Sequence, residues 1–374
     1  MPALPPLSDD EARRYARHLA LAEVGAIGQA RLKQAKVLVV GAGGLGSPAA
    51  LYLAAAGIGS LGLADFDTVD LSNLQRQVLF GTGDIGRPKV DAARERLAAL
   101  NPQLSIVTHA AKVDAASAGA LFAGYDVILD GSDRLATRYL VNDACVLGGK
   151  PLVSAAIHRF EGQAMTYVPG KGPCYRCLFP DAERALVPSC AEAGVLGVLP
   201  GVMGSLQATE AIKLVLGIGE PLIGRFLVYD ALSLRFQEFR FARRHDCAVC
   251  GDAPTITSLA SEPEPGVSQL EHWSPSQLAQ VLDSPQAGQH VLVDVREPQE
   301  WVMGRIPGSL HIPLAQLPAR FAEIPEDRLA VFICAGGVRS LTACRFAVQA
   351  GRDAVNLEGG LYAWSAAFGA PPAP

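Results

Sequence analysis

Residues 37–46 read VLVVGAGGLG, an apolar run followed directly by glycines. Gly41, Gly43 and Gly46 have the G-x-G-x-x-G spacing, in which a turn after a buried strand brings backbone amides against phosphate groups. Pro48 follows in the expected first turn of a helix, a position that proline favours. The stretch therefore predicts a strand, a glycine-rich turn and a helix that bind a nucleotide, and the motif alone suits NAD as well as ATP.

Strand-like and helix-like segments alternate on both sides of this stretch. A capped helical arm is expected before it, over residues 11–35, with SDDE ahead of the apolar positions. Further strands are expected at residues 61–64, 105–108, 127–129 and 152–154, and helices at 48–56, 89–100 and 136–147. This alternation predicts an α/β fold with a parallel, doubly wound, Rossmann-like sheet.

The pattern changes after residue 250. The stretch SLASEPEPGVS at 258–268 has no helical or strand period. Beyond it, HVLVDV and LAVFIC are expected strands of a second, smaller α/β domain. We therefore expect a first domain at residues 1–252, a linker at 253–270 and a second domain at 271–374.

Composition excludes several classes of protein. Of the 374 residues 49% are hydrophobic and 18% charged, which indicates a folded chain rather than a disordered one. The formal net charge of -5 lacks the basic excess of a nucleic-acid binder. Residues 37–64 are uncharged, but their glycines and Pro48 favour a buried strand, turn and helix over a membrane span. The acidic, proline-containing N-terminus does not resemble a signal peptide, so we expect a cytoplasmic protein with no nucleic-acid or membrane partner.

Polar residues follow the expected strand ends. Asp65 and Asp67 end the second strand, where a carboxylate binds ribose hydroxyls. The sequence SNLQRQ at 72–77 and then Lys89 add cations that suit a triphosphate under attack rather than a dinucleotide. Asp133 follows the strand at 127–129, where a Mg²⁺ ion that bridges phosphates can be held. Each residue alone is also typical of a surface charge, but their shared place at strand ends and loops favours an ATP site.

Nine short motifs resemble those of the bacterial MoeB/ThiF adenylyltransferases, relatives of ubiquitin-activating enzymes. In order they are GAGGLG, DFDTVDLSNLQRQ, GRPK, DGSD, TRYLVND, PCYRC, EAGVLG, GSLQATEAIK and YDA, and together they cover residues 11–252. Members of this family adenylate the C-terminal Gly-Gly carboxylate of a ubiquitin-like sulfur-carrier protein. In the implied reaction this carboxylate attacks the α-phosphate of ATP, while Arg76, Lys89 and Mg²⁺ neutralise charge as pyrophosphate leaves.

The motif and the resemblance together imply a set of site residues. The nucleotide-binding residues expected are Gly41, Gly43, Gly44, Gly46, Asp65, Ser72, Asn73, Arg76, Lys89 and Asp133. The resemblance also implies that Arg17 reaches the phosphates of a partner subunit, and hence a homodimer. Arg134 departs from the family, which commonly has an asparagine at this position, so one expected amide contact is missing.

Two C-x-x-C pairs predict a metal site. Cys174 and Cys177, with Cys247 and Cys250, match the four thiolates of a closed, tetrahedral structural Zn²⁺ site. The alternative is a redox dithiol, which requires one C-x-x-C at a helix start beside a thioredoxin-like sheet. Two matched pairs favour zinc.

The other cysteines of the first domain carry weaker signals. The resemblance puts Cys190, in PSCAEAGV, where the family carries a thiol near the carrier's tail, so a thioester or acyl disulfide is one interpretation. The residues around it show nothing that lowers its pKa except a helix N-terminus, and an inert loop cysteine is the other interpretation. Cys145, and Cys344 in the second domain, are expected to be packing residues.

Cys334 ends an apolar strand and opens CAGGVRS, residues 334–340, ahead of a helix. A sulfur at this point lies in a cup of amides at a helix N-terminus, which stabilises a thiolate or persulfide. Residues 273–364 resemble the rhodanese (sulfurtransferase) domain, with further matches in LVDVREPQEW, GRIPGSLHIPL and LEGGLYAW. By resemblance Cys334 carries the sulfane sulfur and Arg339 holds it, while Asp294 and Arg296 serve structure.

Two positions of this domain depart from the family. Arg305 replaces a frequent histidine, and Ala335 stands where these loops often carry a cation, which leaves Arg339 as the one positive charge of the loop. Thiosulfate is therefore expected to be a poor sulfur donor, and a protein persulfide, such as that of a cysteine desulfurase, the better one.

The two expected domains, one that makes an acyl-adenylate and one that carries sulfur, are fused in one chain. The fusion raises the effective concentration of each site at the other and favours direct transfer. It therefore indicates an adenylyltransferase/sulfurtransferase that makes a carrier thiocarboxylate. One alternative is a thioester-forming activator of a ubiquitin-like modifier, with Cys190 as nucleophile and the rhodanese domain as a docking module. Another is a non-catalytic, nucleotide-binding scaffold. The pathway, whether molybdopterin, thiamine, cysteine or tRNA thiolation, stays open because fold does not determine it.

Overall fold

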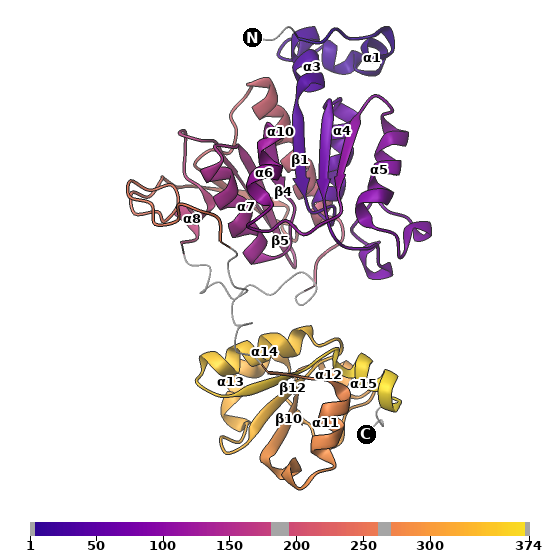
Figure 1. The fold of residues 1–374 in the computed structure, drawn as a ribbon, viewed down its shortest axis with the longest axis vertical. Coiled ribbons are helices and arrows are strands. Elements are labelled where there is room, and N and C mark those ends of the chain that lie inside the picture. Colours follow the sequence, from indigo (N-terminus) through magenta and orange to yellow (C-terminus); the bar gives the residue numbers. More distant parts are fainter. Residues whose placement is uncertain (1–3, 181–193, 261–270, 371–374) are drawn as a thin grey trace. The chain divides into compact units, whose positions relative to one another are not determined.

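The structure is a computed structural model that describes residues 4–180, 194–260 and 271–370. The chain divides into two compact units, Met1–Glu262 and Pro263–Pro374, each with its own sheet (Figure 1). Ile256 and Leu259, which lie inside the expected linker, pack against the hydrophobic core of the first unit. The domain boundaries at residues 252 and 270 stay a prediction.

Eight strands form the sheet of the first unit. They are β1 (Lys36–Val40), β2 (Ser60–Ala64), β3 (Ser105–His109), β4 (Val127–Asp130), β5 (Leu152–His158), β6 (Glu161–Tyr167), β7 (Arg225–Asp230) and β8 (Arg235–Arg240). Their order is β3-β2-β1-β4-β5-β6-β7-β8, and the pairs from β3 to β5 are parallel. The strand order reverses between β1 and β4, the kind of position at which α/β sheets bind ligands outside the carboxyl ends of their strands.

Helices cover both faces of this sheet. They are α1 (Asp9–Arg14), α2 (Ala16–Leu19), α3 (Gly25–Gln34), α4 (Gly46–Ala56), η1 (Leu71–Asn73), η2 (Thr82–Asp84), α5 (Lys89–Leu100), α6 (Ala118–Ala123), α7 (Leu135–Leu147), α8 (Tyr175–Leu178) and α10 (Leu199–Leu216). Val37 and Val39 of β1 join the core formed with α4, α5 and α10, whereas Leu38 and Val40 join the core formed with α6 and α7. Figure 1 shows α4 and α5 on one side of β1, and α6 and α7 on the other. Burial on both faces explains why the central strand β1 is a continuous apolar run.

The N-terminal arm is helical as expected, but it forms three short helices instead of one. Ser8 and Glu11 make the capping box that the sequence SDDE predicts. The first helix then ends at Arg14, and the buried ring of the next residue, Tyr15, places its hydroxyl 2.9 Å from the donating Asn101 Nδ2. Gly25, at a φ of +52°, begins the third helix with a backbone that no continuous helix contains. Packing of Tyr15 and the turn at Gly25 therefore divide the arm.

The sheet is mixed, which corrects the expectation of a purely parallel one, while the α/β class is confirmed. Strands β5 to β8 pair antiparallel. The hairpin between β5 and β6 turns through Arg159 and Phe160, with Arg159 at a φ of +53°. The sequence missed this turn because neither residue is the glycine or asparagine that usually marks such hairpins.

The second unit contains a five-stranded parallel sheet in the order β11-β10-β12-β13-β9. Its strands are β9 (Glu271–Trp273), β10 (His290–Asp294), β11 (Leu310–His311), β12 (Leu329–Ile333) and β13 (Ala354–Leu357). Its helices are α11 (Pro275–Leu282), η3 (Pro285–Gln289), α12 (Pro298–Trp301), η4 (Leu314–Gln316), α13 (Leu317–Arg320), η5 (Phe321–Glu323), α14 (Val338–Gln349) and α15 (Gly360–Phe368). Across the described parts of both units, no helix combines the length and the apolar character that a membrane span requires.

Candidate functional site

The glycine-rich turn leaves β1 at Gly41, whose φ of +88° lies in the left-handed region that favours glycine. A side chain at Gly46 would collide with the carbonyl oxygen of Gly41, so the first helical turn can approach the strand only with glycine here. The Ala42 amide between them donates to Asp65 Oδ2 at 2.8 Å. This hydrogen bond ties the turn to the carboxyl end of β2.

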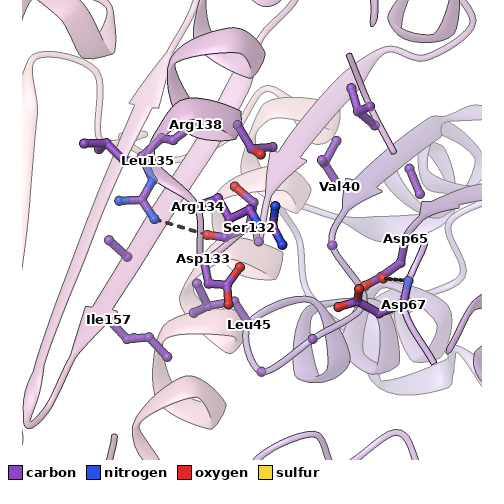
Figure 2. A pocket seen from close by; sticks show the side chains of 18 of the residues that line it. Val40, Leu45, Asp65, Asp67, Ser132, Asp133, Arg134, Leu135, Arg138 and Ile157 are labelled. Atoms are coloured by element: carbon purple, nitrogen blue, oxygen red, sulfur yellow. Dashed lines mark hydrogen bonds between the residues drawn. The ribbon is translucent and has the colours of Figure 1, made fainter. Parts of the chain in front are cut away.

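A pocket of about 270 Å³ opens at this edge of the sheet. Seven of the expected nucleotide-binding residues line it, namely Gly41, Gly43, Gly44, Asp65, Arg76, Lys89 and Asp133. They come from the segments that follow β1, β2 and β4, beside the point where the strand order reverses. Figure 2 shows Asp65 and Asp67 next to each other and Asp133 across the pocket from them. The tertiary fold thus gathers residues that are up to about ninety positions apart in the sequence.

Hydrogen bonds and an ion pair fix the charged side chains that line the pocket. Burial raises the pKa of Asp65, although the amides of Ala42 and Asp67 donate to its two carboxylate oxygens. Lys89 is the first residue of α5, and its side chain is only 7% exposed. Its ammonium Nζ lies 3.1 Å from Asp67 Oδ2. A lysine so little exposed to water interacts strongly with any phosphate that enters the pocket.

Four expected site residues lie outside the pocket wall. Ser72 and Asn73 form η1, where the Ser72 hydroxyl donates to Asp70 Oδ1 and the Ser72 carbonyl accepts from Arg76 Nη1 at 3.0 Å. Gly46 is needed for the close approach described above and does not line the pocket. Arg17 lies exposed on α2. The contacts expected of these residues stay predictions.

Sequence reasoning did not select Arg138, which lines the pocket, or the buried Asp130, which contacts the pocket-lining residues Ser132 and Arg138. Asp130 ends β4 and is fully buried, and burial raises its pKa. Its Oδ1 accepts from the amide and hydroxyl of Ser132 at 3.0 and 2.6 Å, and its Oδ2 lies 3.6 Å from Arg138 Nε. Arg138 also donates to the Ser132 carbonyl at 3.2 Å (Figure 2). The signal was present, since Asp130 opens the DGSD motif directly after an apolar strand.

The departure at Arg134 lies on the rim of the same pocket. Its guanidinium carbon is 5.7 Å from the ring centre of Phe66, a separation typical of a cation–π contact. Phe66 directly follows Asp65 in the sequence, so this contact joins the segments that follow β4 and β2. Arg134 therefore takes part in the pocket wall without supplying the amide that the family has there.

The four C-x-x-C cysteines come together in one cluster. All four sulfurs lie within 4.8 Å of one another, with separations of 3.6 Å between Cys174 and Cys247 and 3.4 Å between Cys177 and Cys250. Tetrahedral zinc with Zn–S bonds of about 2.3 Å requires sulfurs roughly 3.8 Å apart. The cluster therefore fits a Zn²⁺ ion, and four protein ligands leave no open position for substrate.

The cysteine cluster is joined to the nucleotide pocket by helix α8. Tyr175, between two of the cysteines, lines the pocket. Arg176 forms a buried bidentate pair with Asp143 of α7, at 2.8 and 2.7 Å, and lies over the ring of Tyr139. The cluster thus holds one wall of the pocket in place.

The remaining cysteines of the first domain fall into two groups. Cys145 is buried as expected, and burial raises the pKa of its thiol, as it also does for Cys344 in the second unit. Both are packing residues. Cys190 lies outside the described residues, so its catalytic role stays a prediction.

In the second unit, Cys334 follows β12 and its side chain is buried. Its Sγ accepts from the amide of Gly337 at 3.1 Å and from the hydroxyl of Ser340 at 3.2 Å. Gly337 stands at a φ of +86°, which turns the loop into α14. Residues 334–340 therefore form a cup of neutral donors around one sulfur.

The basic residues near this cup are paired. Arg339 forms a bidentate ion pair with Glu300 of α12, with both N–O distances at 2.6 Å. Arg296 pairs with the buried Asp294 and donates to the carbonyls of Glu300 and Gly304, a structural role like the one expected. Arg305, at the family's frequent histidine position, lies 4.7 Å from the ring centre of Trp301.

Comparison with known proteins agrees with this geometry. The ThiF family model matches residues 15–249, and the Rhodanese-like domain model matches residues 274–367. The probable adenylyltransferase/sulfurtransferase MoeZ of Mycobacterium tuberculosis is 45% identical, over 96% of this chain and 94% of its own. The adenylyltransferase and sulfurtransferase MOCS3 of Sus scrofa is 47% identical, over 86% of this chain and 74% of its own.

Solved structures resemble the chain over about two thirds of its length. The crystal structure of E. coli MccB with ATP superposes with a TM-score of 0.56 at 28% identity, covering 64% of this chain and 74% of that one. The chain therefore belongs to the ThiF family and carries a rhodanese-like domain in its second unit.

Proposed function

We propose that this protein adenylates the C-terminal Gly-Gly carboxylate of a ubiquitin-like sulfur-carrier protein and then converts it to a thiocarboxylate with sulfur carried by Cys334. One observation carries the proposal: a pocket lined by a glycine-rich turn and Lys89, and a buried Cys334 held in a cup of donors, occur in one chain. Relatives aligned over 96% and 86% of this chain bear both activities in their names, adenylyltransferase and sulfurtransferase.

In the first step a carboxylate oxygen of the carrier attacks the α-phosphorus of ATP. The bond from that phosphorus to the bridging oxygen breaks, and pyrophosphate leaves. We propose that Arg76 and Lys89 stabilise the negative charge that develops on the phosphates and that Asp65 binds the ribose hydroxyls, because all three residues line the pocket. We assign Asp133 to Mg²⁺, since carboxylate oxygens are the ligands that this ion prefers and the ion neutralises phosphate charge.

In the second step the terminal sulfur of the Cys334 persulfide attacks the acyl carbon, and AMP leaves. The product is an acyl disulfide between the carrier and Cys334. A second thiolate then attacks the Cys334 sulfur, and the carrier thiocarboxylate is the leaving group. We assign this thiol to Cys190, and the disulfide that forms is reduced by a cellular thiol.

The proposal also covers the metal site, the oligomeric state and the pathway. We assign structural Zn²⁺ to Cys174, Cys177, Cys247 and Cys250, because their sulfurs match its tetrahedral geometry. A homodimer in which Arg17 reaches the partner's nucleotide completes the adenylation site. The carrier belongs to a molybdopterin, thiamine or related sulfur pathway in the cytoplasm, with a protein persulfide as donor.

The test is the intact mass of a carrier ending in Gly-Gly after incubation with this protein, Mg-ATP and a persulfide donor. We expect an exchange of one oxygen for one sulfur in the carrier that requires ATP. The same mixture without ATP is the control, and carriers from several pathways identify the physiological one. An unchanged mass with every carrier contradicts the proposal.

A further inference from the structure

Glu300 neutralises the one basic side chain of the Cys334 loop. Within residues 334–340 only Arg339 is basic, and its two terminal nitrogens both donate to the Glu300 carboxylate at 2.6 Å. Such a bidentate pair uses an edge of the planar guanidinium, whose N–H groups would otherwise bind an anion. The loop therefore presents little net positive charge to a ligand.

The position of Glu300 is built into the fold. The amide of Glu297 donates to Glu300 Oε2 at 3.1 Å in a capping box at the start of α12. Arg296, itself held by the buried Asp294, donates to the Glu300 carbonyl at 3.0 Å. Because both ends of the residue are anchored, the pair with Arg339 is more than a chance contact between two mobile surface side chains.

The charges that face Arg339 disfavour a doubly charged ligand. Glu300 and the nearby Glu297 both act on its guanidinium electrostatically, as does the Cys334 sulfur. The other groups that hold the sulfur, the Gly337 amide and the Ser340 hydroxyl, are neutral donors. Thiosulfate enters as a dianion and releases sulfite, also a dianion, whereas an alkyl persulfide and its thiolate product each carry at most one negative charge.

We propose that Glu300 is a specificity-determining residue, which excludes thiosulfate from Cys334 and selects an alkyl persulfide of the cysteine type as sulfur donor. The inference rests on the proposed sulfurtransferase function. In the selected reaction the Cys334 thiolate attacks the terminal sulfur of the donor persulfide, the donor's S–S bond breaks, and its inner sulfur leaves as a thiolate with the electron pair. The proton of the donor persulfide stays on the transferred sulfur, so no oxidant or reductant is consumed.

The test compares the full-length wild type with Glu300→Gln. The glutamine keeps an oxygen for the Glu297 amide and removes the charge. Cys334 persulfide formation is followed by mass spectrometry with two donors, thiosulfate and N-acetylcysteamine persulfide, which is uncharged apart from its persulfide group. The matched control is Glu323→Gln, which breaks an Arg–Glu pair with Arg320 elsewhere in the same unit.

We expect kcat/KM for thiosulfate to rise at least about tenfold in Glu300→Gln, mainly through KM, and to become more sensitive to salt because Arg339 is then free to bind the dianion. The rate with N-acetylcysteamine persulfide should stay within about twofold, and Glu323→Gln should match the wild type with both donors. An unchanged thiosulfate rate, or an equal loss with both donors, overturns the specificity role. If the wild type and both variants load sulfur from neither donor, the sulfurtransferase function itself fails, and this inference with it.

Discussion

The nucleotide pocket and the Cys334 cup both lie at the carboxyl ends of parallel strands, but they are assembled differently. The cup takes its nucleophile, amide, hydroxyl and guanidinium from residues 334–340 alone. The pocket takes its groups from segments that follow three different strands. Both have their lysine or arginine held by an acid from another segment, Asp67 for Lys89 and Glu300 for Arg339. A local loop thus provides a reactive group, and the fold around it decides the charge that the group meets.

The largest effect that would separate the roles of the pocket and the cup is expected when the nucleophile of the cup, Cys334, is removed. Cys334→Ala should lower thiocarboxylate formation by at least about 1000-fold, because no other described group carries the sulfur. Carrier-dependent pyrophosphate release, which belongs to the pocket, should stay at the wild-type rate. Cys344→Ala, which removes another buried thiol from the same unit, should keep sulfur transfer. An undiminished thiocarboxylate yield from Cys334→Ala contradicts the role of this residue.

The reciprocal change removes the cation of the pocket. Lys89→Ala should reduce carrier-dependent pyrophosphate release by about 100-fold, because an almost buried charge opposite the phosphates is lost. Persulfide formation on Cys334 should be unaffected. Lys36→Ala, an exposed lysine at the amino end of β1, is the control and should release pyrophosphate normally. Near-normal release by Lys89→Ala would remove the basis for assigning adenylation to this pocket.

The cysteine cluster tests whether the two units depend on each other for stability. Cys247→Ser should lose zinc and lower the thermal midpoint of the first unit by roughly 10 °C, because structural zinc contributes several kcal/mol to folding. The three tryptophans, Trp273, Trp301 and Trp364, all lie in the second unit. Their fluorescence transition should therefore stay in place while the circular dichroism transition shifts.

The control for this experiment is His245→Ala, an exposed neighbour of the cluster that is not among the four cysteines. It should keep about one zinc per chain by metal analysis. Freshly purified wild-type protein without zinc would show that the cluster is not a zinc site.

The smallest effect expected is an acid-dependent loss of stability in the second unit. The ion pair with Arg339 holds the pKa of Glu300 below its ordinary value of 4.5. The stability that the pair contributes is therefore complete above pH 4.5 and is lost as the pH falls through the lower folded value. Glu300→Gln should remove this part of the acid dependence, measured by urea unfolding followed through tryptophan fluorescence. Identical pH dependences for both proteins would mean that the pair does not stabilise the unit.

The parts of the fold that the sequence predicted well are those whose signals are local. The five strands from β1 to β5 were predicted from their apolar runs; β1, β2, β4 and the first half of β5 are largely buried, whereas the edge strand β3 is exposed or half-buried. Strands β6 to β8 were not predicted, and in β8 every residue is exposed, so that strand shows no burial pattern to detect. The turn between β5 and β6 also lacks the usual sequence signature. Arg159 adopts a positive φ there, although it is neither glycine nor asparagine.

The sequence by itself determined the glycine turn at Gly41, the C-x-x-C pairs, the Cys334 loop and, through the motifs that resemble known families, the two activities proposed. These features depend on neighbouring residues, whose geometry follows from the backbone and from residue type. Only the tertiary structure decided that Arg138 lines the pocket beside the buried Asp130 and that Glu300 neutralises Arg339. Such contacts join residues whose distance in space is set by strand order and helix packing, which no local pattern encodes.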